Sequence, residues 1–277
     1  MARVVRLTTY PIKGCAGVSL DRAVLTPAGL AHDRAFMVVD AEGRFRSQRR
    51  DPGLARIHPV PSADGTRLTL RAAGLPPLVC ATDAIGPRRP VTLFDSPFHG
   101  IDQGPEAADW LSTALGAPSR LVRVPPEHDR VTDGLAPGTS GFADSCAVHL
   151  LSLASLDHLN ARVAARGGRP VPIDRFRANV VVDGWAAPHT EDRARTLKIG
   201  DATLRYAKLA IRCAVTLVDQ TTGDRAGPEP LRTLAAYRRA AAGGVAFGAK
   251  FAVAGPGTLS VGDPVRTTER GASELGR

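Results

Sequence analysis

Short strand-like segments separated by turns recur through the first 120 residues and constrain the fold more than any other feature. Residues 4–12 have the pattern of a strand. Residues 35–39 and 44–46 predict a hairpin across the turn at residues 40–43. The same rhythm continues in three further segments, at residues 67–70, 77–80 and 90–94. This half of the chain is therefore predicted to be all β.

Three segments have the pattern of helices. Residues 105–116 begin with proline, end with glycine and place apolar side chains on one stripe. Residues 155–166 and 230–241 both stop before paired glycines. Strand-like segments lie between and after these helices, so the predicted fold class is α+β, predominantly β. Residues 125–141 predict a long loop that gates a site, and residues 267–277 a frayed tail.

Length and hydropathy limit the class of protein. The chain has 277 residues, of which 43% are hydrophobic, and its mean hydropathy is −0.08. These values suit a soluble protein of one large or two closely packed domains. No apolar run approaches the roughly 20 residues needed to span a bilayer, and the N-terminus lacks a signal-peptide pattern. We expect a cytoplasmic protein without a membrane partner.

The net charge of +9 raises the question of nucleic-acid binding. The densest basic cluster, residues 44–50, contains four arginines. No helix-turn-helix, zinc-finger or RNA-recognition signature accompanies it. We therefore expect no nucleic-acid partner and favour a small anionic ligand or an acidic protein partner.

The four cysteines, Cys15, Cys80, Cys146 and Cys213, are scattered without the spacing of a CxxC or Cys/His ligand set. The pattern predicts neither a disulfide framework nor a zinc site. It also lacks the four-cysteine run of a fused iron–sulfur cluster. Reduced thiols are expected.

Cys213 lies in an alternating segment, residues 208–217, that predicts a half-buried strand. One interpretation is a core cysteine in an apolar row. The other is a thiolate ligand or nucleophile whose pKa the neighbouring Arg212 lowers. Adjacent strand residues point to opposite faces, so both side chains serve one site only if a bulge or a strand end re-aims one of them.

A series of motifs in a fixed order extends over nearly the whole chain. It includes Tyr10-Pro11-Ile12-Lys13, Asp33-Arg34, Phe142-Ala143-Asp144, Arg175-Phe176-Arg177-x-Asn179, Arg212-Cys213 and Val261-Gly262-Asp263-Pro264-Val265. In these motifs and their order the chain resembles the MOSC family. The resemblance implies an N-terminal MOSC-associated β-barrel-like domain over residues 1–120 and a MOSC β-barrel domain over residues 121–266, with a few peripheral helices.

Within that family the chain is most similar to amidoxime-reducing components and to bacterial reductases of N-hydroxylated bases. The resemblance implies a molybdenum cofactor, a pyranopterin dithiolene with a terminal phosphate, held between the two β domains. Cys213 matches the cysteine that completes the metal's coordination, which makes it the implied catalytic residue and metal ligand. Soft thiolate is a sensible donor to molybdenum.

Other cofactor-binding positions follow from the same resemblance. The implied contacts are Lys13, Gly14, Arg34, Asp144, Ser145, Arg177, Asn179, Arg212 and Cys213. Guanidinium groups suit phosphate and planar pterin edges, and asparagine supplies both a donor and an acceptor. The chain departs from the family at four positions: Gly14 replaces a serine, Ala178 a proline, Ala210 a cysteine and Cys146 a serine.

The function implied is molybdenum-dependent, two-electron reduction of N-hydroxylated compounds with release of water. Electrons are expected from a separate protein of the flavodoxin, ferredoxin or flavoprotein-reductase type. The alternatives are a sulfur-carrier or molybdenum-cofactor-handling MOSC module, or a biosynthetic enzyme on the same scaffold. The full N-terminal β domain favours the reductase.

Overall fold

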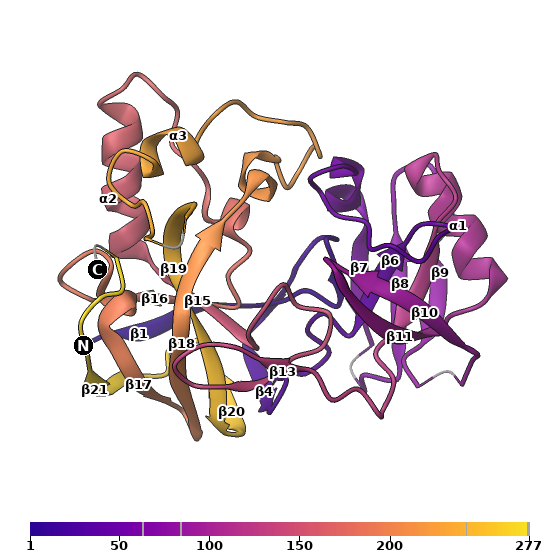
Figure 1. Ribbon diagram of the computed structural model, residues 1–277, viewed down its shortest axis with the longest axis horizontal. Helices are drawn as coiled ribbons and strands as arrows, with labels where there is room; N and C mark the ends of the chain where they lie inside the picture. The colour runs from indigo at the N-terminus through magenta and orange to yellow at the C-terminus, as the bar shows by residue number, and fades with distance from the viewer. Residues whose placement is uncertain (63, 84, 242, 276–277) are drawn as a thin grey trace.

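The computed structural model describes residues 1–62, 64–83, 85–241 and 243–275. It consists of two β-rich units that lie side by side, with helices at the periphery (Figure 1). The larger unit is built on an eight-stranded sheet and the smaller unit on a five-stranded sheet. The predominantly β fold predicted from the short-strand pattern is confirmed. Among the described residues, neither sheet is closed by pairing of its end strands.

The eight-stranded sheet contains strands from near the N-terminus and from near the C-terminus of the chain. Its order is β21 (Val265–Arg270), β17 (Ala194–Ile199), β18 (Ala202–Arg212), β19 (Val245–Gly255), β15 (Val148–Ser152), β16 (Val180–Asp183), β1 (Arg3–Thr9) and β3 (Val18–Leu20). Most neighbours are antiparallel, but β15 and β16 are parallel. Because β1 and β3 extend a sheet made by the second half of the chain, residues 3–9 and 18–20 belong in space to the larger unit.

The smaller unit is built mainly from the middle part of the N-terminal half of the chain. Its five-stranded sheet has the order β10 (Arg88–Leu93), β11 (Ser96–Asp102), β12 (Arg120–Arg123), β6 (Phe36–Val39) and β2 (Ile12–Lys13). A three-stranded sheet of β7 (His58–Pro61), β8 (Arg67–Arg71) and β9 (Leu78–Ala81) shares its core with helix α1 (Pro105–Leu115). Of the hairpin predicted at residues 35–46, the second arm makes two isolated bridges, between Val39 and Phe45 and between Arg44 and Thr92, and no strand.

The described residues also contain short strands and 3₁₀ helices outside these sheets. Strands β20 (Gly257–Ser260), β4 (Arg22–Thr26) and β5 (Gly29–Leu30) form a three-stranded sheet, and β13 (Val131–Thr132) pairs with β14 (Gly138–Thr139). The 3₁₀ helices are η1 (Pro52–Arg56), η2 (Ile173–Phe176), η3 (Thr190–Arg193) and η4 (Ala214–Leu217). The predicted loop at residues 125–141 therefore contains a short hairpin.

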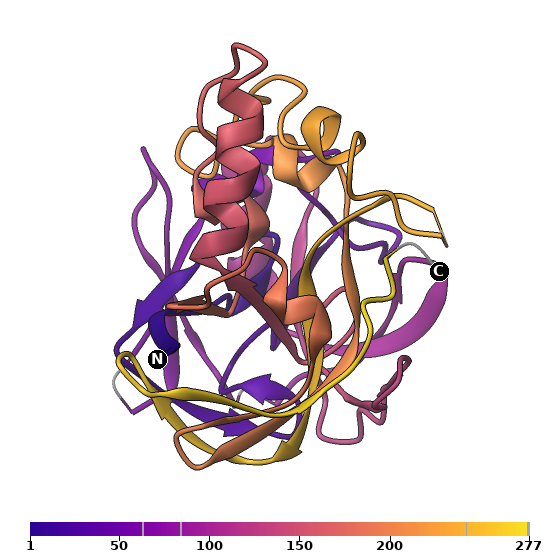
Figure 2. The same cartoon turned by 90° about the vertical axis from the view of Figure 1, so that its left-hand side faces the viewer.

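Two predicted helices are confirmed with small changes at their ends. Helix α1 starts at Pro105 and ends before Gly116, whose φ of +66° forms a left-handed cap. Helix α2 (Leu153–Ala164) starts two residues earlier than predicted, because the Ser152 side chain accepts a hydrogen bond from the Ser155 backbone N–H as its N-cap. Figure 2 shows α2 standing at the edge of the larger unit.

The third predicted helix, at residues 230–241, is wrong. Only α3 (Leu231–Leu234) is helical. The chain then turns, and Arg238 receives a backbone hydrogen bond from Ala246 at 2.9 Å while its Nε donates to the Ala246 carbonyl at 3.0 Å. These long-range bonds draw the segment toward β19 and outweigh its helical periodicity.

The frayed tail predicted after residue 266 is also corrected. Residues 267–270 belong to β21, which pairs antiparallel with β17. The pairing gives the polar strand a backbone ladder at the sheet edge, which side-chain polarity alone does not reveal. Within the described part of the chain, no helix has the length and apolar character to cross a membrane.

Candidate functional site

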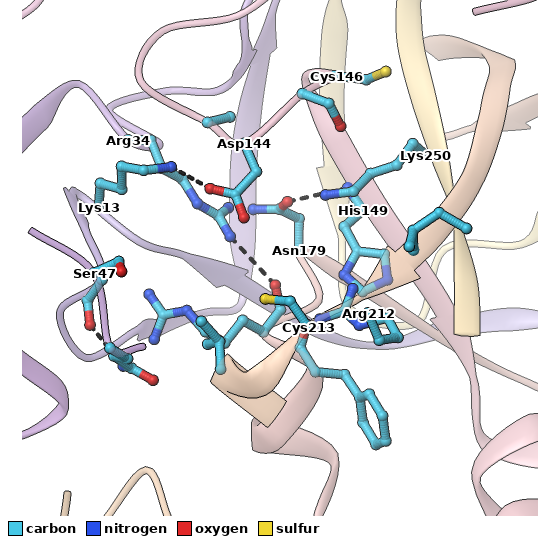
Figure 3. Close-up of a pocket in the computed structure, with 18 of the residues that line it drawn as sticks. Lys13, Arg34, Ser47, Asp144, Cys146, His149, Asn179, Arg212, Cys213 and Lys250 are labelled. Carbon is cyan, nitrogen blue, oxygen red and sulfur yellow. Dashed lines mark hydrogen bonds and ion pairs between the residues drawn. The ribbon is translucent and has the colours of Figure 1, made fainter. Parts of the chain in front are cut away.

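A cavity of about 230 Å³ lies where the two units meet (Figure 3). Its walls come from the β2 and β6 region of the smaller unit and from β15, β18, β19 and the η2 and η4 turns of the larger one. The structure brings every predicted site residue to this one cavity: Lys13, Gly14, Arg34, Asp144, Ser145, Arg177, Asn179, Arg212 and Cys213.

Cys213 reaches the cavity because strand β18 ends immediately before it. The ladder between β18 and β19 shifts register between Leu209 and Ile211, and Cys213 then caps the η4 turn. The predicted apolar row is therefore wrong beyond Leu209, since Ile211 is 48% exposed. This bulge and strand end bring both Cys213 and Arg212 to the cavity wall. Cys213 is partly exposed, unlike the three other cysteines.

Two arginines that are far apart in the sequence both stack on one buried ring. The Arg34 and Arg177 guanidinium carbons lie 4.3 Å and 4.2 Å from the centre of the Tyr10 ring. Arg34 also donates to the Arg177 carbonyl at 3.3 Å and to Asp33 at 2.6 Å. Both arginines have left-handed backbones, with φ of +48° and +53°. Such conformations are uncommon for residues other than glycine and cluster at functional sites.

Asn179 positions the site through its own side chain. Its Nδ2 donates to the Thr8 carbonyl at 3.1 Å and to Asp33 Oδ1 at 3.0 Å, and its Oδ1 accepts from the His149 backbone N–H at 3.1 Å. Asp33 Oδ1 also accepts from the Tyr10 backbone N–H. The Asn179 amide therefore joins β1, β15 and the Asp33 turn, and its hydrogen bonds are used within the protein.

Lys13 and Asp144 form an ion pair at the cavity wall. Burial lowers the pKa of the Lys13 ammonium, although the Asp144 charge opposes the shift. Desolvation raises the pKa of the Asp144 carboxyl, but the charge and hydrogen bond of Lys13, together with the charges of Lys250 and Arg34, outweigh it and the net pKa is lowered. The Asp144 side chain is 58% exposed, so its charge remains available to the cavity.

The loops beside this pair explain two sequence features. Gly14 has a φ of +84°, which favours glycine over the serine common in the family. On the other side, the segment predicted as a gating loop is tied to the Asp144 turn, because Arg130 donates to the carbonyls of Gly141, Ala143 and Asp144. The gating role itself stays a prediction.

Several cavity residues were not predicted from the sequence. They are Phe45, Ser47, Gln48, Arg49, Ala143, Cys146, His149, Phe176, Lys208, Leu209, Ile211, Val215 and Lys250. The clearest available signal was a polar side chain inside an apolar strand, as at His149 and Lys250. Burial and nearby cations hold the pKa of His149 well below its usual value, and burial with Arg212 and Arg34 lowers that of Lys250 to about 8.

The chain matches the MOSC N-terminal beta barrel domain over residues 1–118 and the MOSC domain over residues 137–266. Mitochondrial amidoxime-reducing component 1 of Mus musculus is 34% identical over 287 residues, with 95% of this chain and 81% of that protein covered. Its Homo sapiens counterpart is 33% identical over 285 residues, with 95% and 82% covered.

A second kind of relative shares the same region. Molybdenum cofactor sulfurase of Anopheles gambiae is 33% identical over 277 residues, with 91% of this chain but 34% of that longer protein covered. Both kinds of relative match along nearly all of this chain. The resemblance carried by the ordered motifs is thereby confirmed, and the chain belongs to the MOSC-domain proteins that also contain the MOSC N-terminal domain.

Proposed function

We propose that this protein is a molybdenum-dependent reductase of N-hydroxylated compounds, with its cofactor in the cavity between the two units. The observation that carries the proposal is the partly exposed Cys213 thiol in a cavity whose other chemistry is mainly cationic. The amidoxime-reducing relatives, which this chain matches over most of their length, support the reaction type.

The residues present fit an anionic cofactor with a soft metal. Among the described residues, two buried nitrogens at the cavity, His149 Nε2 and Arg212 Nε, have no hydrogen-bond partner. Buried polar atoms are normally paired, so these atoms are suited to a ligand. Thiolate is a soft donor suited to a metal already held by dithiolene sulfur. Cys213 would hold the metal, and Lys13, Arg34, Arg177 and Arg212 would bind phosphate and pterin.

When bound, the cofactor supplies the two-electron chemistry that removes the substrate oxygen. In the overall reaction, the N–O bond breaks and an N–H bond forms; two electrons and two protons are consumed and one water leaves. The protein's part is to hold and orient the reactants and to control solvent. The Arg34–Tyr10–Arg177 stack holds two cations in place, and Asn179 ties the Asp33 turn, which precedes Arg34, to β1 and β15.

The test is metal analysis and turnover of protein made in a host that synthesises molybdenum cofactor. We expect near-stoichiometric molybdenum and pterin, and reduction of benzamidoxime to benzamidine with a chemically reduced viologen as electron donor. Protein that contains neither molybdenum nor pterin after such expression overturns the proposal. A separate flavodoxin-, ferredoxin- or flavoprotein-reductase-like donor is proposed for turnover without viologen.

A sulfur-carrier role is the second candidate, favoured by the sulfurase match and by the accessible Cys213 thiol. The two functions differ in what Cys213 carries. Mass spectrometry that finds a persulfide on Cys213, in protein free of pterin, supports the carrier and contradicts the reductase.

The Tyr10 ring is expected to determine cofactor retention. In Tyr10→Leu the two guanidinium groups lose their shared stacking surface, and we expect about tenfold weaker retention of pterin. Tyr10→Phe is the matched control: it keeps the ring and removes only a long hydrogen bond to the Ala178 carbonyl, at 3.4 Å. The measurement is pterin content after gel filtration, with thermal unfolding to verify folding. Equal loss in both variants contradicts a role for the ring.

A further inference from the structure

Three titratable side chains form a row across adjacent strands of the large sheet. His149 on β15 is directly opposite Lys250 on β19, and Lys250 is directly opposite Lys208 on β18. Opposed residues project from the same face of a sheet, with their Cβ atoms about 5 Å apart. All three side chains line the cavity. The sheet therefore presents two lysines and a buried histidine to the ligand space.

The charges in this row are incompletely balanced within the described residues. Lys208 pairs with Asp133 at 2.5 Å. Lys250, which is half-buried, has no carboxylate at ion-pair distance in residues 1–62, 64–83, 85–241 and 243–275, and the nearby Asp144 carboxylate is paired with Lys13. Like charges opposite each other destabilise a sheet. The unbalanced charge of Lys250 therefore lowers the stability of the folded protein, and a bound anionic ligand offsets this loss.

Lys250 lies apart from Lys13 and Arg34, two of the groups assigned to the cofactor, and on the same side of the cavity as Arg212. Figure 3 shows Lys250 and His149 on one side of the cavity and Lys13 and Arg34 on the other, with Asp144 between them in that view. Lys250 is also on a central strand of the sheet, a rigid position that suits recognition of a small group.

We propose that Lys250, supported by Lys208, binds a negatively charged substituent of the substrate, so that the preferred N-hydroxylated substrates carry a carboxylate or phosphate group. The inference rests on the proposed reductase function and narrows its substrate class. Lys250 is then a specificity-determining residue that distinguishes anionic from neutral substrates through one charge-assisted hydrogen bond.

The test compares benzamidoxime with 4-carboxybenzamidoxime in molybdenum-loaded protein. We expect the parent to favour the carboxylated probe in kcat/KM by about tenfold or more, the usual effect of one hydrogen bond to a charged group. Lys250→Met should remove this preference, whereas Lys250→Arg should keep most of it. Lys198→Met is the control, because Lys198 is exposed on β17 and does not line the cavity.

Two further readouts separate this inference from the reductase proposal. Binding of both probes is measured by calorimetry without an electron donor, so the preference is tested even if neither probe is reduced. Molybdenum and pterin contents are measured in every variant. Equal binding of the two probes by the parent, or an unchanged preference in Lys250→Met, overturns the inference. Loss of pterin from Lys250→Met also overturns it, because Lys250 would then bind the cofactor.

Discussion

Replacing Cys213 by alanine is expected to lower the rate of the proposed N-hydroxyl reduction by more than about 100-fold while the protein stays folded. Changes to residues that only support a metal ligand cost 10- to 100-fold, so loss of the ligand itself has a larger effect. Cys213 is partly exposed at the end of β18, and its removal leaves no core cavity. Viologen-coupled turnover and molybdenum content measure the result, and pterin is expected to remain through the cationic groups.

Cys80→Ala is the matched control for this substitution. Cys80 is buried in the core of the smaller unit, away from the cavity, and burial raises the pKa of its thiol to about 11. Its loss is expected to lower stability slightly and to leave turnover unchanged. Full activity in Cys213→Ala would contradict the assignment of Cys213 as the metal ligand.

Arg238→Met is expected to lower the free energy of unfolding by about 3–5 kcal/mol, because it leaves a buried charge without its partner. Arg238 and Asp192 are 2.8 Å apart, and their side chains are only 4% and 1% exposed. Arg238 also donates to the Ala246 carbonyl, which joins the turn after α3 to β19. Urea unfolding measures the loss, with Arg239→Met as the exposed neighbouring control.

The destabilisation of Arg238→Met should depend on pH. Burial raises the pKa of Asp192, and the Arg238 charge opposes that shift. Without Arg238 the folded-state pKa rises further above the unfolded value, so the folded state binds a proton that the unfolded state releases. The variant therefore loses stability as pH rises through that range, and the deficit is smaller near about pH 5 than near about pH 8. A second change, Asp192→Asn, should recover part of the loss.

The sequence predicted those structural features that depend on residues close together in the chain. Helix α1 has its proline start and glycine end within one segment, and the ordered motifs predicted nine residues that the structure places at the cavity wall. The third helix failed because Arg238 bonds across the chain to Ala246. Lys250 was missed because its importance comes from its neighbours on β15 and β18, which lie far away in sequence.

The bulge in β18, at the site itself, is another feature that depends on long-range pairing and that the local sequence does not predict. Strict alternation places Arg212 and Cys213 on opposite faces, and the sequence indicates only that a bulge or strand end would reunite them. The register shift after Leu209 depends on pairing with β19, so it is a property of the sheet. Local periodicity therefore identified the thiol without predicting how it reaches the cavity.

The position of β1 in the large sheet has a consequence for biosynthesis. β1 leaves the ribosome long before its partner β16, which is made more than 170 residues later, with Arg3 opposite Asp183. The separation in sequence is larger still between β4 and its partner β20. Such non-local pairing forms slowly and leaves nascent edges exposed. The cavity needs walls from both halves, so it is complete only after β19, which carries Lys250, has been translated. Insertion of the proposed cofactor is therefore expected to follow synthesis of β19.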